Sequence, residues 1–559
     1  MSFLDSKRLT LVLQIALAMA LIVLVDSLAS FYFFRLDLTE ENRYSISEAT
    51  KNMLENLDDD IYIEAYLDGE LPAGFKRMRS SLEETLNEFA LYSHGKIQFQ
   101  FVDPDQASSA KSRNQFMMSV ARKGVQPTDV FLTEDGKRTQ KRIIPGVVIS
   151  YGSVEKGVQL FKGNKAASPE QRLNQSIEGI EYELASAIKD ITTMNMPTLG
   201  VLRGHNELDS ADFVSLNRQL QESFIVKYID LTQVDKIPAL DAVLLVKPTE
   251  RFSLYDKYKI DQYLMKGGKG LFLLDKVAVN MDSANVGTYS FPYDLDLDDL
   301  LFKYGVRINN DLIQDYVSGT YPIVVGNEGN QPKIQLLQWP YYPVVNEYTP
   351  HVTVRNLDAT LTRFASSIDT VKASGIHKTL LFSSSPYSRK VMSPAYVDIN
   401  LLQQELDPQK FTDQNIPMAW LLEGQFTSFF KNRFLPDEAN PQDFNESGDS
   451  KLIVVGDGDL AGNSFDPKTG RPLPLGYDAF TNQTFANQEL IMNFLNYLTK
   501  GNGLITARSK EVIIRPLDGV KLKENRSKWQ IINLLIPVVL VILFGLIHFW
   551  LRKRKYTRH

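Results

Sequence analysis

His205 and Glu207 are the first candidates for chemistry in this sequence. They lie in Gly204-His205-Asn206-Glu207, directly after Leu199–Leu202, which has the composition of a buried strand. In an open α/β sheet, ligands bind at the carboxyl ends of the strands, so both side chains could contact a ligand there. The simpler interpretation is a tight strand-to-helix turn whose polar residues face water. The sequence leaves both interpretations open.

Asp457 and Asp459 form the second candidate. They lie in Gly456-Asp457-Gly458-Asp459, which follows the apolar stretch Lys451–Val455. Two carboxylates separated by one residue in a glycine loop could hold a cation. A plain loop that caps the next element is the simpler interpretation. We treat these two aspartates, with His205 and Glu207, as candidate ligand-binding residues, and expect no catalytic residue, resident metal or cofactor.

A third acidic run, Asp294-x-Asp296-x-Asp298-Asp299, imitates the start of a calcium-binding loop. Such a loop needs a glycine at its sixth position and a glutamate at its twelfth, where this run has Asp299 and Gly305 instead. The N-terminus of a helix, where carboxylates are favoured, fits the run better.

Several protein classes are excluded by what the chain lacks. It has no cysteine, which removes disulfides, cysteine zinc sites, iron–sulfur clusters and a cysteine nucleophile. It has neither a Gly-x-x-x-x-Gly-Lys-Ser/Thr phosphate loop nor a Gly-x-Ser-x-Gly elbow. The net charge is −6 although both ends are basic, so the intervening segment is acidic and poorly suited to nucleic-acid binding.

Apolar segments near both ends indicate membrane-spanning helices. Residues 9–34 and 531–551 are long enough to cross a bilayer, for which about 20 apolar residues suffice. Lys7-Arg8 precedes the first, and the basic run 552–555 follows the second. The positive-inside rule then places both termini in the cytoplasm, in a two-pass inner-membrane protein with a large periplasmic domain. A cleaved signal peptide, ending at Ser27-Leu28-Ala29, is the alternative for the first segment.

Two α/β domains are predicted between the helices, since 559 residues are too many for one hydrophobic core. The pattern over residues 45–165 gives a β-α-β start followed by more strands, which suits a thioredoxin-like arrangement without its redox cysteines. Residues 168–500 alternate buried strands with helices, as in a doubly wound, flavodoxin-like parallel sheet. We expect insertions at about 280–375 and 386–450, and a stalk at 501–528.

A set of short motifs, taken in order, is shared with a known family. They are the N-terminal anchor running into Arg35-Leu-Asp-Leu-Thr-Glu-Glu-Asn-Arg-Tyr-Ser, then Phe101-Val-Asp-Pro, Gly204-His-Asn-Glu, Val454-Val-Gly-Asp-Gly-Asp and the basic C-terminal anchor. In these features nearly the whole chain resembles GldG, the auxiliary "substrate-binding" component of the gliding-motility ABC transporter of Bacteroidetes. That family tends to have glycine where Asn206 stands, which puts in doubt any role that needs glycine flexibility there. The central unit also resembles class I glutamine amidotransferase folds, but their nucleophile is a cysteine.

The resemblance implies a complex in which a separate membrane permease and a separate cytoplasmic ATPase carry out transport. This chain would be a non-enzymatic auxiliary subunit in the lipid bilayer beside the permease, associated with gliding motility or the cell envelope. A stand-alone extracytoplasmic ligand-binding or scaffolding protein is the alternative. A membrane-anchored hydrolase that uses Asp457 and Asp459 is the third hypothesis.

Overall fold

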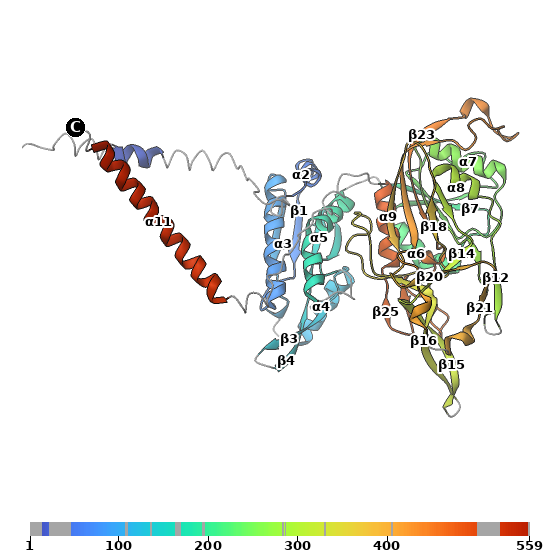
Figure 1. The fold of residues 1–559 in the computed structure, drawn as a ribbon, viewed down its shortest axis with the longest axis horizontal. Coiled ribbons are helices and arrows are strands. Elements are labelled where there is room, and N and C mark those ends of the chain that lie inside the picture. The colour runs from blue at the N-terminus through green and yellow to red at the C-terminus, as the bar shows by residue number, and fades with distance from the viewer. Residues whose placement is uncertain are drawn as a thin grey trace, which may run out of the picture. The chain divides into compact units, whose positions relative to one another are not determined.

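The computed structural model of this chain describes residues 14–21, 46–106, 110–134, 137–162, 169–192, 196–281, 284, 287–328, 331–403, 406–499 and 526–556. The chain divides into two compact units, Met1–Lys510 and Glu511–His559. The first holds a mixed α/β body, and the second holds the long helix α11 (Arg526–Tyr556), both drawn in Figure 1.

The N-terminal domain is built on a four-stranded mixed sheet of order β2-β1-β5-β6, in which β1 and β2 are parallel and the other pairs antiparallel. Its strands are β1 (Ile61–Ala65), β2 (Ile97–Phe101), β5 (Gly146–Tyr151) and β6 (Val154–Gln159). Its helices are α2 (Glu48–Glu55), α3 (Ala73–Tyr92), α4 (Ala110–Arg122) and α5 (Pro169–Thr192). A separate hairpin is formed by β3 (Thr128–Glu134) and β4 (Lys137–Ile143). The predicted β-α-β start corresponds to β1-α3-β2.

The helix α5 packs in the core of this domain. Its residues Leu184 and Ile188 belong to the same buried cluster as Ile63 of β1. Glu181 of α5 also accepts hydrogen bonds from the backbone N–H of Ser47 (2.7 Å) and from the hydroxyl of Thr50 (2.8 Å), which tie it to α2. The sequence boundary near residue 165 assigns this helix to the second domain, whereas its apolar face is buried in the first.

The second domain is built on a seven-stranded sheet of order β19-β22-β23-β10-β9-β7-β8. Five strands are parallel: β7 (Thr198–Arg203), β8 (Ile225–Asp230), β9 (Ala242–Val246), β10 (Lys269–Leu273) and β23 (Ser447–Val455). Numbered along the chain, these five lie in the order 2-1-3-4-5, which is common among doubly wound sheets. β22 (Pro417–Thr427) and β19 (Ile376–Ser383) extend the sheet with antiparallel pairs.

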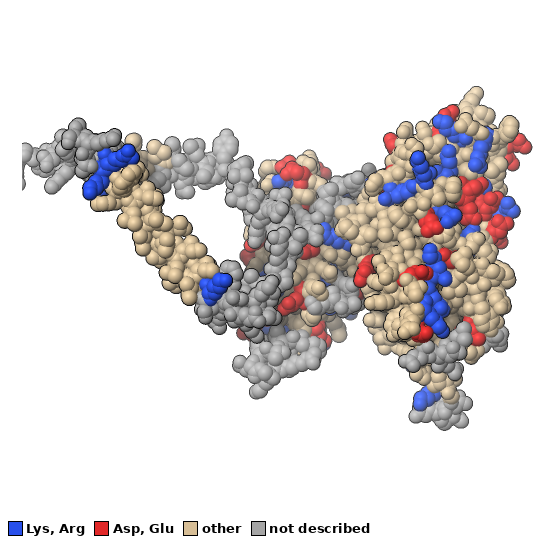
Figure 2. All heavy atoms as spheres, in the orientation of Figure 1, with Lys and Arg blue, Asp and Glu red and all other residues tan. Residues whose placement is uncertain are grey.

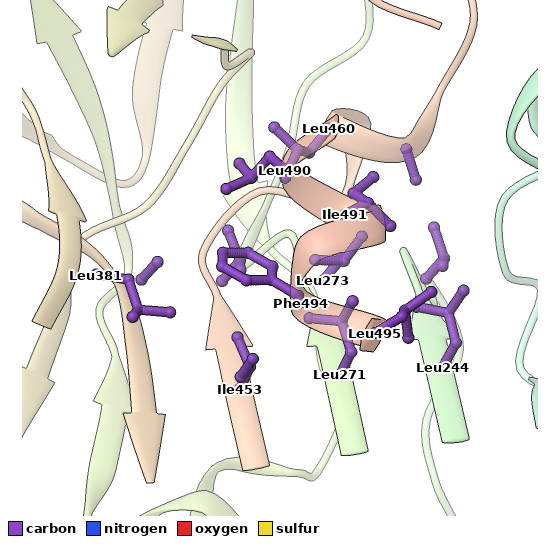
Figure 3. Close-up of a cluster of buried hydrophobic side chains, with 14 of the residues drawn as sticks. Leu244, Leu271, Leu273, Leu381, Ile453, Leu460, Leu490, Ile491, Phe494 and Leu495 are labelled. Carbon is purple, nitrogen blue, oxygen red and sulfur yellow. The ribbon is translucent and has the colours of Figure 1, made fainter. Parts of the chain in front are cut away.

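Helices cover both faces of this sheet. The helices α6 (Ser210–Ser223) and α9 (Asn487–Thr499) bury apolar side chains against one face, and α7 (Leu254–Met265) and α8 (Asp298–Tyr304) do so on the other. The adjacent residues Val243 and Leu244 of β9 belong to different clusters, because successive side chains of a strand point to opposite faces. Figure 3 shows Phe494 and its neighbours on α9 directed toward the strand side chains.

The predicted insertion at 386–450 is wrong in its central part. β22 lies between β19 and β23 in the main sheet. Met418, Ala419, Leu421 and Leu422 are fully buried there, but the polar stretches on either side conceal this short apolar run in the sequence. A strand joined by antiparallel pairing needs no crossover helix, so the regular alternation of strand and helix does not reveal it.

Five smaller sheets accompany the main sheet in the described part of this domain. Two of them have three strands: β11 (Val277–Ala278), β12 (Thr288–Pro292) and β21 (Ala395–Val397) form one, and β15 (Ser318–Glu328), β16 (Gln331–Val345) and β17 (Thr360–Leu361) form the other. The other three have two strands each: β13 (Val306–Ile308) pairs with β18 (Ile368–Thr370), β14 (Asp311–Asp315) with β20 (Ser388–Met392), and β24 (Tyr477–Asp478) with β25 (Gln483–Thr484). The hairpin of β15 and β16 extends from the domain as a long two-stranded ribbon (Figure 1).

Within the described residues, one helical segment is long and apolar enough to cross a membrane, namely Ile531–Arg554 of α11. Basic side chains mark both ends of α11, and the surface between them carries no charged side chain (Figure 2). Of the predicted first helix at 9–34, residues 14–21 are helical, and the rest lies outside the described residues. The predicted stalk at 501–528 also lies outside them up to residue 525.

Candidate functional site

One lysine and three aspartates meet at the carboxyl ends of three adjacent parallel strands. Lys247 follows β9, Asp275 lies just beyond β10, and Asp457 and Asp459 follow β23. The carboxyl ends of parallel strands meet at one edge of a sheet, which is the edge where open α/β sheets bind ligands. The topology thus brings together residues that lie up to 212 positions apart in the sequence.

Lys247 supplies the positive charge of this cluster. Its Nζ lies 3.1 Å from Asp275 Oδ2 and donates a hydrogen bond to Asp459. Burial alone would lower the pKa of Lys247, but the charges of Asp275 and Asp459 raise it above its ordinary value, so the side chain remains an ammonium. Its backbone φ of 47° is in the left-handed region, which costs a residue with a side chain about 1–2 kcal/mol.

Gly458 allows the loop after β23 to approach this lysine. A Cβ at Gly458 would lie 2.7 Å from the Cβ of Lys247, so no residue other than glycine fits without displacement. The backbone N–H of Gly458 also donates a hydrogen bond of 2.5 Å to Asp275 Oδ1. The glycine is therefore required by close packing at the cluster.

Asp457 and Asp459 have different environments although only one residue separates them. Asp457 is fully buried and accepts hydrogen bonds from the backbone N–H groups of Arg363 (2.8 Å) and Leu460 (3.1 Å). Burial, then the charges of Asp275 and Asp459, raises the pKa of Asp457 well above its ordinary value. The side chain of Asp459 is 23% exposed. Asp457 thus holds the loop together, and Asp459 is the one of the two that can meet a ligand.

The three aspartates have a spacing that suits a metal ion, since one oxygen of each lies within 4.8 Å of the others. The ammonium of Lys247 contacts two of them, Asp275 and Asp459. Burial, then the charge of Asp459, raises the pKa of Asp275 to about 6. The positive charge beside Asp275 and Asp459 in this structure is therefore a lysine side chain.

A cavity of ≈ 690 Å³ adjoins this cluster, and we refer to it as the carboxyl-edge cavity. Its charged lining residues are Lys247, Arg363 and Asp459. Its aromatic lining residues are Tyr289, Phe291, Tyr293, Tyr342 and Phe364. The volume lies within the range of about 300–1,000 Å³ that is usual for small-molecule sites, and the lining combines aromatic walls with a few polar groups as such sites do.

His205 and Glu207 do not line this cavity. The predicted strand-to-helix turn is present, but both side chains are buried. His205 Nε2 lies 3.3 Å from Asp256 Oδ2, and the imidazole stacks on Phe252 with ring centroids 3.6 Å apart. Glu207 accepts hydrogen bonds of 3.1 and 3.2 Å from the backbone N–H of His205. The side chains of His205 and Glu207 therefore face the interior, while Asn206 between them is exposed.

Asn206 occupies the position in this turn where the resemblance predicts glycine. Its φ of 50° is in the left-handed region, as is the φ of 114° at Gly204. Asparagine adopts this region more readily than other residues with a side chain, so the turn keeps its geometry without a second glycine.

The acidic run at 294–299 forms the N-terminus of a helix, as predicted. Asp298 and Asp299 lie in the first turn of α8. Lys257 Nζ lies 3.1 Å from carboxylate oxygens of Asp296 and of Asp299. Arg251 contacts Asp294 and Asp296, and Lys276 contacts Asp298, so three basic residues offset most of the charge of the four aspartates. Figure 2 shows acidic and basic side chains gathered together in the region of α8.

Comparison with known proteins places the second domain in a family. Residues 196–494 match the auxiliary proteins described as an ABC-type uncharacterized transport system, and the match spans more than half of the 559 residues. The chain belongs to this auxiliary family. Residues 40–150, in the N-terminal domain, match a domain of unknown function. The matched segment of the auxiliary family contains the whole seven-stranded sheet and every residue that lines the carboxyl-edge cavity.

One similar protein spans almost the whole chain. An uncharacterized protein of Borreliella burgdorferi is 23% identical over 564 residues, which cover 97% of this chain and 98% of that protein. Among solved structures, the mmIFT52 N-terminal domain is 14% identical with a TM-score of 0.31, covering 55% of this chain and 99% of that one. A ThuA-like protein from Parabacteroides merdae is 11% identical with a TM-score of 0.23, covering 57% and 92%. TM-scores this low carry no conclusion about the fold.

Three residues at the site, Lys247, Asp275 and Arg363, were not predicted from the sequence as site residues. Lys247 and Asp275 directly follow apolar strands, so a charged residue at the end of a buried strand was the available signal. Arg363 lies in a loop after β17, and no local pattern connects it to the edge of the sheet. Its guanidinium donates a hydrogen bond to Ser464 Oγ (3.1 Å) and lies 5.4 Å from the ring centre of Tyr342.

We expect the stability of this auxiliary-family domain to depend on pH through His205. Burial alone would lower its pKa, but the hydrogen bond to Asp256 and the carboxylate of Glu207 raise it from 6.5 to about 9. A folded-state pKa above the unfolded value means that the stabilisation is complete below about pH 6.5 and is lost as pH rises through about 9. We expect a loss of about 1–2 kcal/mol over this window, because solvent screens part of the interaction.

Chemical unfolding of the solubilised chain at pH 6 and pH 9 measures this loss. His205→Gln should remove most of the difference between the two pH values. His377→Gln, at an exposed position on β19, is the matched control and should keep it. An identical pH dependence in the wild type and in His205→Gln would show that the histidine is not the group responsible.

Proposed function

We propose that this chain is a non-enzymatic, membrane-anchored auxiliary subunit of an ABC-type transporter complex. The match of residues 196–494 to the auxiliary family carries the proposal. The apolar helix Ile531–Arg554 supports anchoring in the lipid bilayer. Transport and ATP hydrolysis belong to a separate permease and a separate cytoplasmic ATPase, in keeping with the lack of a phosphate loop in the sequence.

The geometry at the carboxyl edge supports binding more than catalysis. A general acid or base must come within hydrogen-bond reach of the substrate. Asp457 is fully buried and His205 lies in the interior, so neither can do so in this arrangement. Asp459 is engaged by the ammonium of Lys247. The membrane-anchored hydrolase is therefore the weakest of the three hypotheses.

We also propose a fold for each of the two domains and an orientation of the chain in the membrane. The order β2-β1-β5-β6 with its parallel first pair supports a thioredoxin-like N-terminal domain, and the five parallel strands support a flavodoxin- or amidotransferase-like second domain. We propose that helices at both ends anchor the chain in the inner membrane, with both termini cytoplasmic and the body periplasmic. The basic residues at 7–8 and 552–555 support this orientation.

The absence of cysteine makes the topology directly testable. Glu438→Cys introduces a single thiol on the exposed surface of the body, and Thr557→Cys introduces one after the C-terminal helix. A membrane-impermeant maleimide should label Glu438→Cys in cells with a permeabilised outer membrane, and Thr557→Cys only after lysis. Labelling of both thiols, or of neither, before lysis would contradict the two-pass arrangement. The wild-type chain is the background control.

Affinity capture after mild cross-linking in intact cells tests the transporter assignment. The tagged full-length chain should recover a multi-span permease and an ATPase with a phosphate loop. The resemblance to GldG adds the narrower proposal that this complex serves gliding motility or the cell envelope. Deletion of the gene for this chain should then impair surface movement or envelope integrity. Recovery of envelope proteins without a permease or ATPase would instead favour a stand-alone binding or scaffolding protein, which the carboxyl-edge cavity also supports.

A further inference from the structure

Tyr289 and Phe291 form an aromatic wall of the carboxyl-edge cavity that lies outside the hydrophobic core clusters. Tyr289 and Phe291 are 60% and 58% exposed, and both line the cavity. They are two residues apart on β12, so they share one face of the strand, whereas Ser290 between them is buried on the other face. Two large exposed aromatic side chains on one face beside a cavity provide a contact surface for an apolar or flat molecule.

Among the described residues, the inner part of the cavity carries a paired and an unpaired charge. Lys247 and Asp459 both line it, but they neutralise each other through their hydrogen bond. Asp275 and Asp457 lie behind them and do not line it. Arg363 forms no ion pair with any carboxylate in the part of the chain that the structure describes, and its guanidinium contacts the hydroxyl of Ser464 and the ring of Tyr342.

We propose that the carboxyl-edge cavity binds a small organic anion, with the guanidinium of Arg363 contacting its carboxylate or phosphate and the aromatic wall contacting its body. A guanidinium presents paired N–H donors that match the two oxygens of a carboxylate or phosphate. The face of Tyr342 holds the guanidinium in place without neutralising its charge. This inference does not depend on a transporter partner.

A cationic ligand is disfavoured by the same contacts. It would have to displace the ammonium of Lys247 from Asp459, which is the only carboxylate among the described lining residues. It would also lie beside the positive charge of Arg363. The neighbouring carboxylates Asp275 and Asp457 have raised pKa values through burial and the charges around them, which reduces the negative charge behind the cavity. An anion needs no such displacement.

Ligand-observed NMR on the purified full-length chain at pH 7 tests the proposal with four probes. Benzoate and phenyl phosphate carry the anionic group on a flat body, benzamide carries the body without charge, and inorganic phosphate carries the charge without the body. Benzoate and phenyl phosphate should bind saturably and compete with each other. Benzamide and inorganic phosphate should bind about tenfold more weakly or worse.

Three variants separate the two parts of the site. Arg363→Gln keeps a donor for Ser464 and should weaken both anionic probes about tenfold or more. Tyr289→Ala removes an exposed wall residue and should weaken the aromatic anions but not inorganic phosphate. Arg433→Gln is the matched control, because Arg433 also stacks on an aromatic ring, that of Phe429, outside the cavity.

Several outcomes would overturn the proposal. They are equal binding of benzamide and benzoate, unchanged anion binding in Arg363→Gln, and an equal loss in Arg433→Gln. The absence of saturable binding of both aromatic anions to the folded wild-type chain would also overturn it. None of these results bears on co-purification with a permease and an ATPase, so this proposal and the transporter assignment can fail separately.

Discussion

Replacing Lys247 with methionine should destabilise the second domain by about 3–5 kcal/mol, the usual cost of removing one partner from a buried ion pair. The ammonium lies 3.1 Å from Asp275 and donates a hydrogen bond to Asp459, and without it these carboxylates would remain close together with Asp457. Thermal or chemical unfolding of the solubilised chain measures the effect. The loss should shrink as pH falls toward about 6, because the pKa of Asp275 is about 6 beside Lys247 and higher without it, so this carboxylate takes up a proton first in the variant.

Two further variants test whether the missing ammonium causes the loss of stability in Lys247→Met. Lys247→Met combined with Asp459→Asn should recover part of the lost stability, because one of the uncompensated charges is gone. Lys266→Met, at an exposed position after α7, should change stability by no more than about 0.5 kcal/mol. If Lys247→Met were as stable as Lys266→Met, the lysine would not be the counter-ion that the geometry describes.

Replacing Phe494 with alanine should cost about 3–5 kcal/mol, the range for emptying the site of a buried aromatic side chain. Phe494 is 0% exposed and is directed from α9 toward the strands of the main sheet (Figure 3). The loss of this contact would weaken the packing of α9 against the core that positions the carboxyl edge. A lower unfolding midpoint with an unchanged native spectrum is the expected observation.

Phe434 provides the matched control for this change. It is a phenylalanine of the same domain with 98% of its surface exposed, so Phe434→Ala removes the same atoms without creating a cavity. Its effect should stay within about 0.5 kcal/mol. Similar losses in the two variants would mean that Phe494 does not pack as described, or that Phe434 is covered by a partner in the purified sample.

The parallel part of the main sheet could be predicted because its strands are short continuous apolar runs. Ala242–Val246 is such a run, and the structure places it as β9 with the same bounds. Helical spacing over Tyr255–Met265 and Glu489–Leu498 likewise predicts α7 and α9 to within a few residues. These signals are local, since a buried strand or one face of a helix must be apolar wherever it lies in the chain.

The candidate site could be predicted only in part, because its geometry depends on contacts between distant residues. Asp459 reaches the cavity, as its place after a buried strand suggested, but Asp457 turns inward to cap its own loop. His205 follows a strand in the same way, yet its side chain is buried in contact with Asp256, which lies 51 residues away in the sequence. No spacing in the sequence shows that Arg363 would reach the same cavity.

Site-directed cross-linking from α11 tests most directly whether this chain is a subunit beside a permease. Because the chain has no native cysteine, single cysteines at successive positions from Ile536 to Leu543 would be the only thiols available. The account predicts cross-links to one multi-span membrane protein, recurring at every third or fourth position because one face of a helix makes the contact. Cross-links only between copies of this chain, or to no protein at any position, would contradict it.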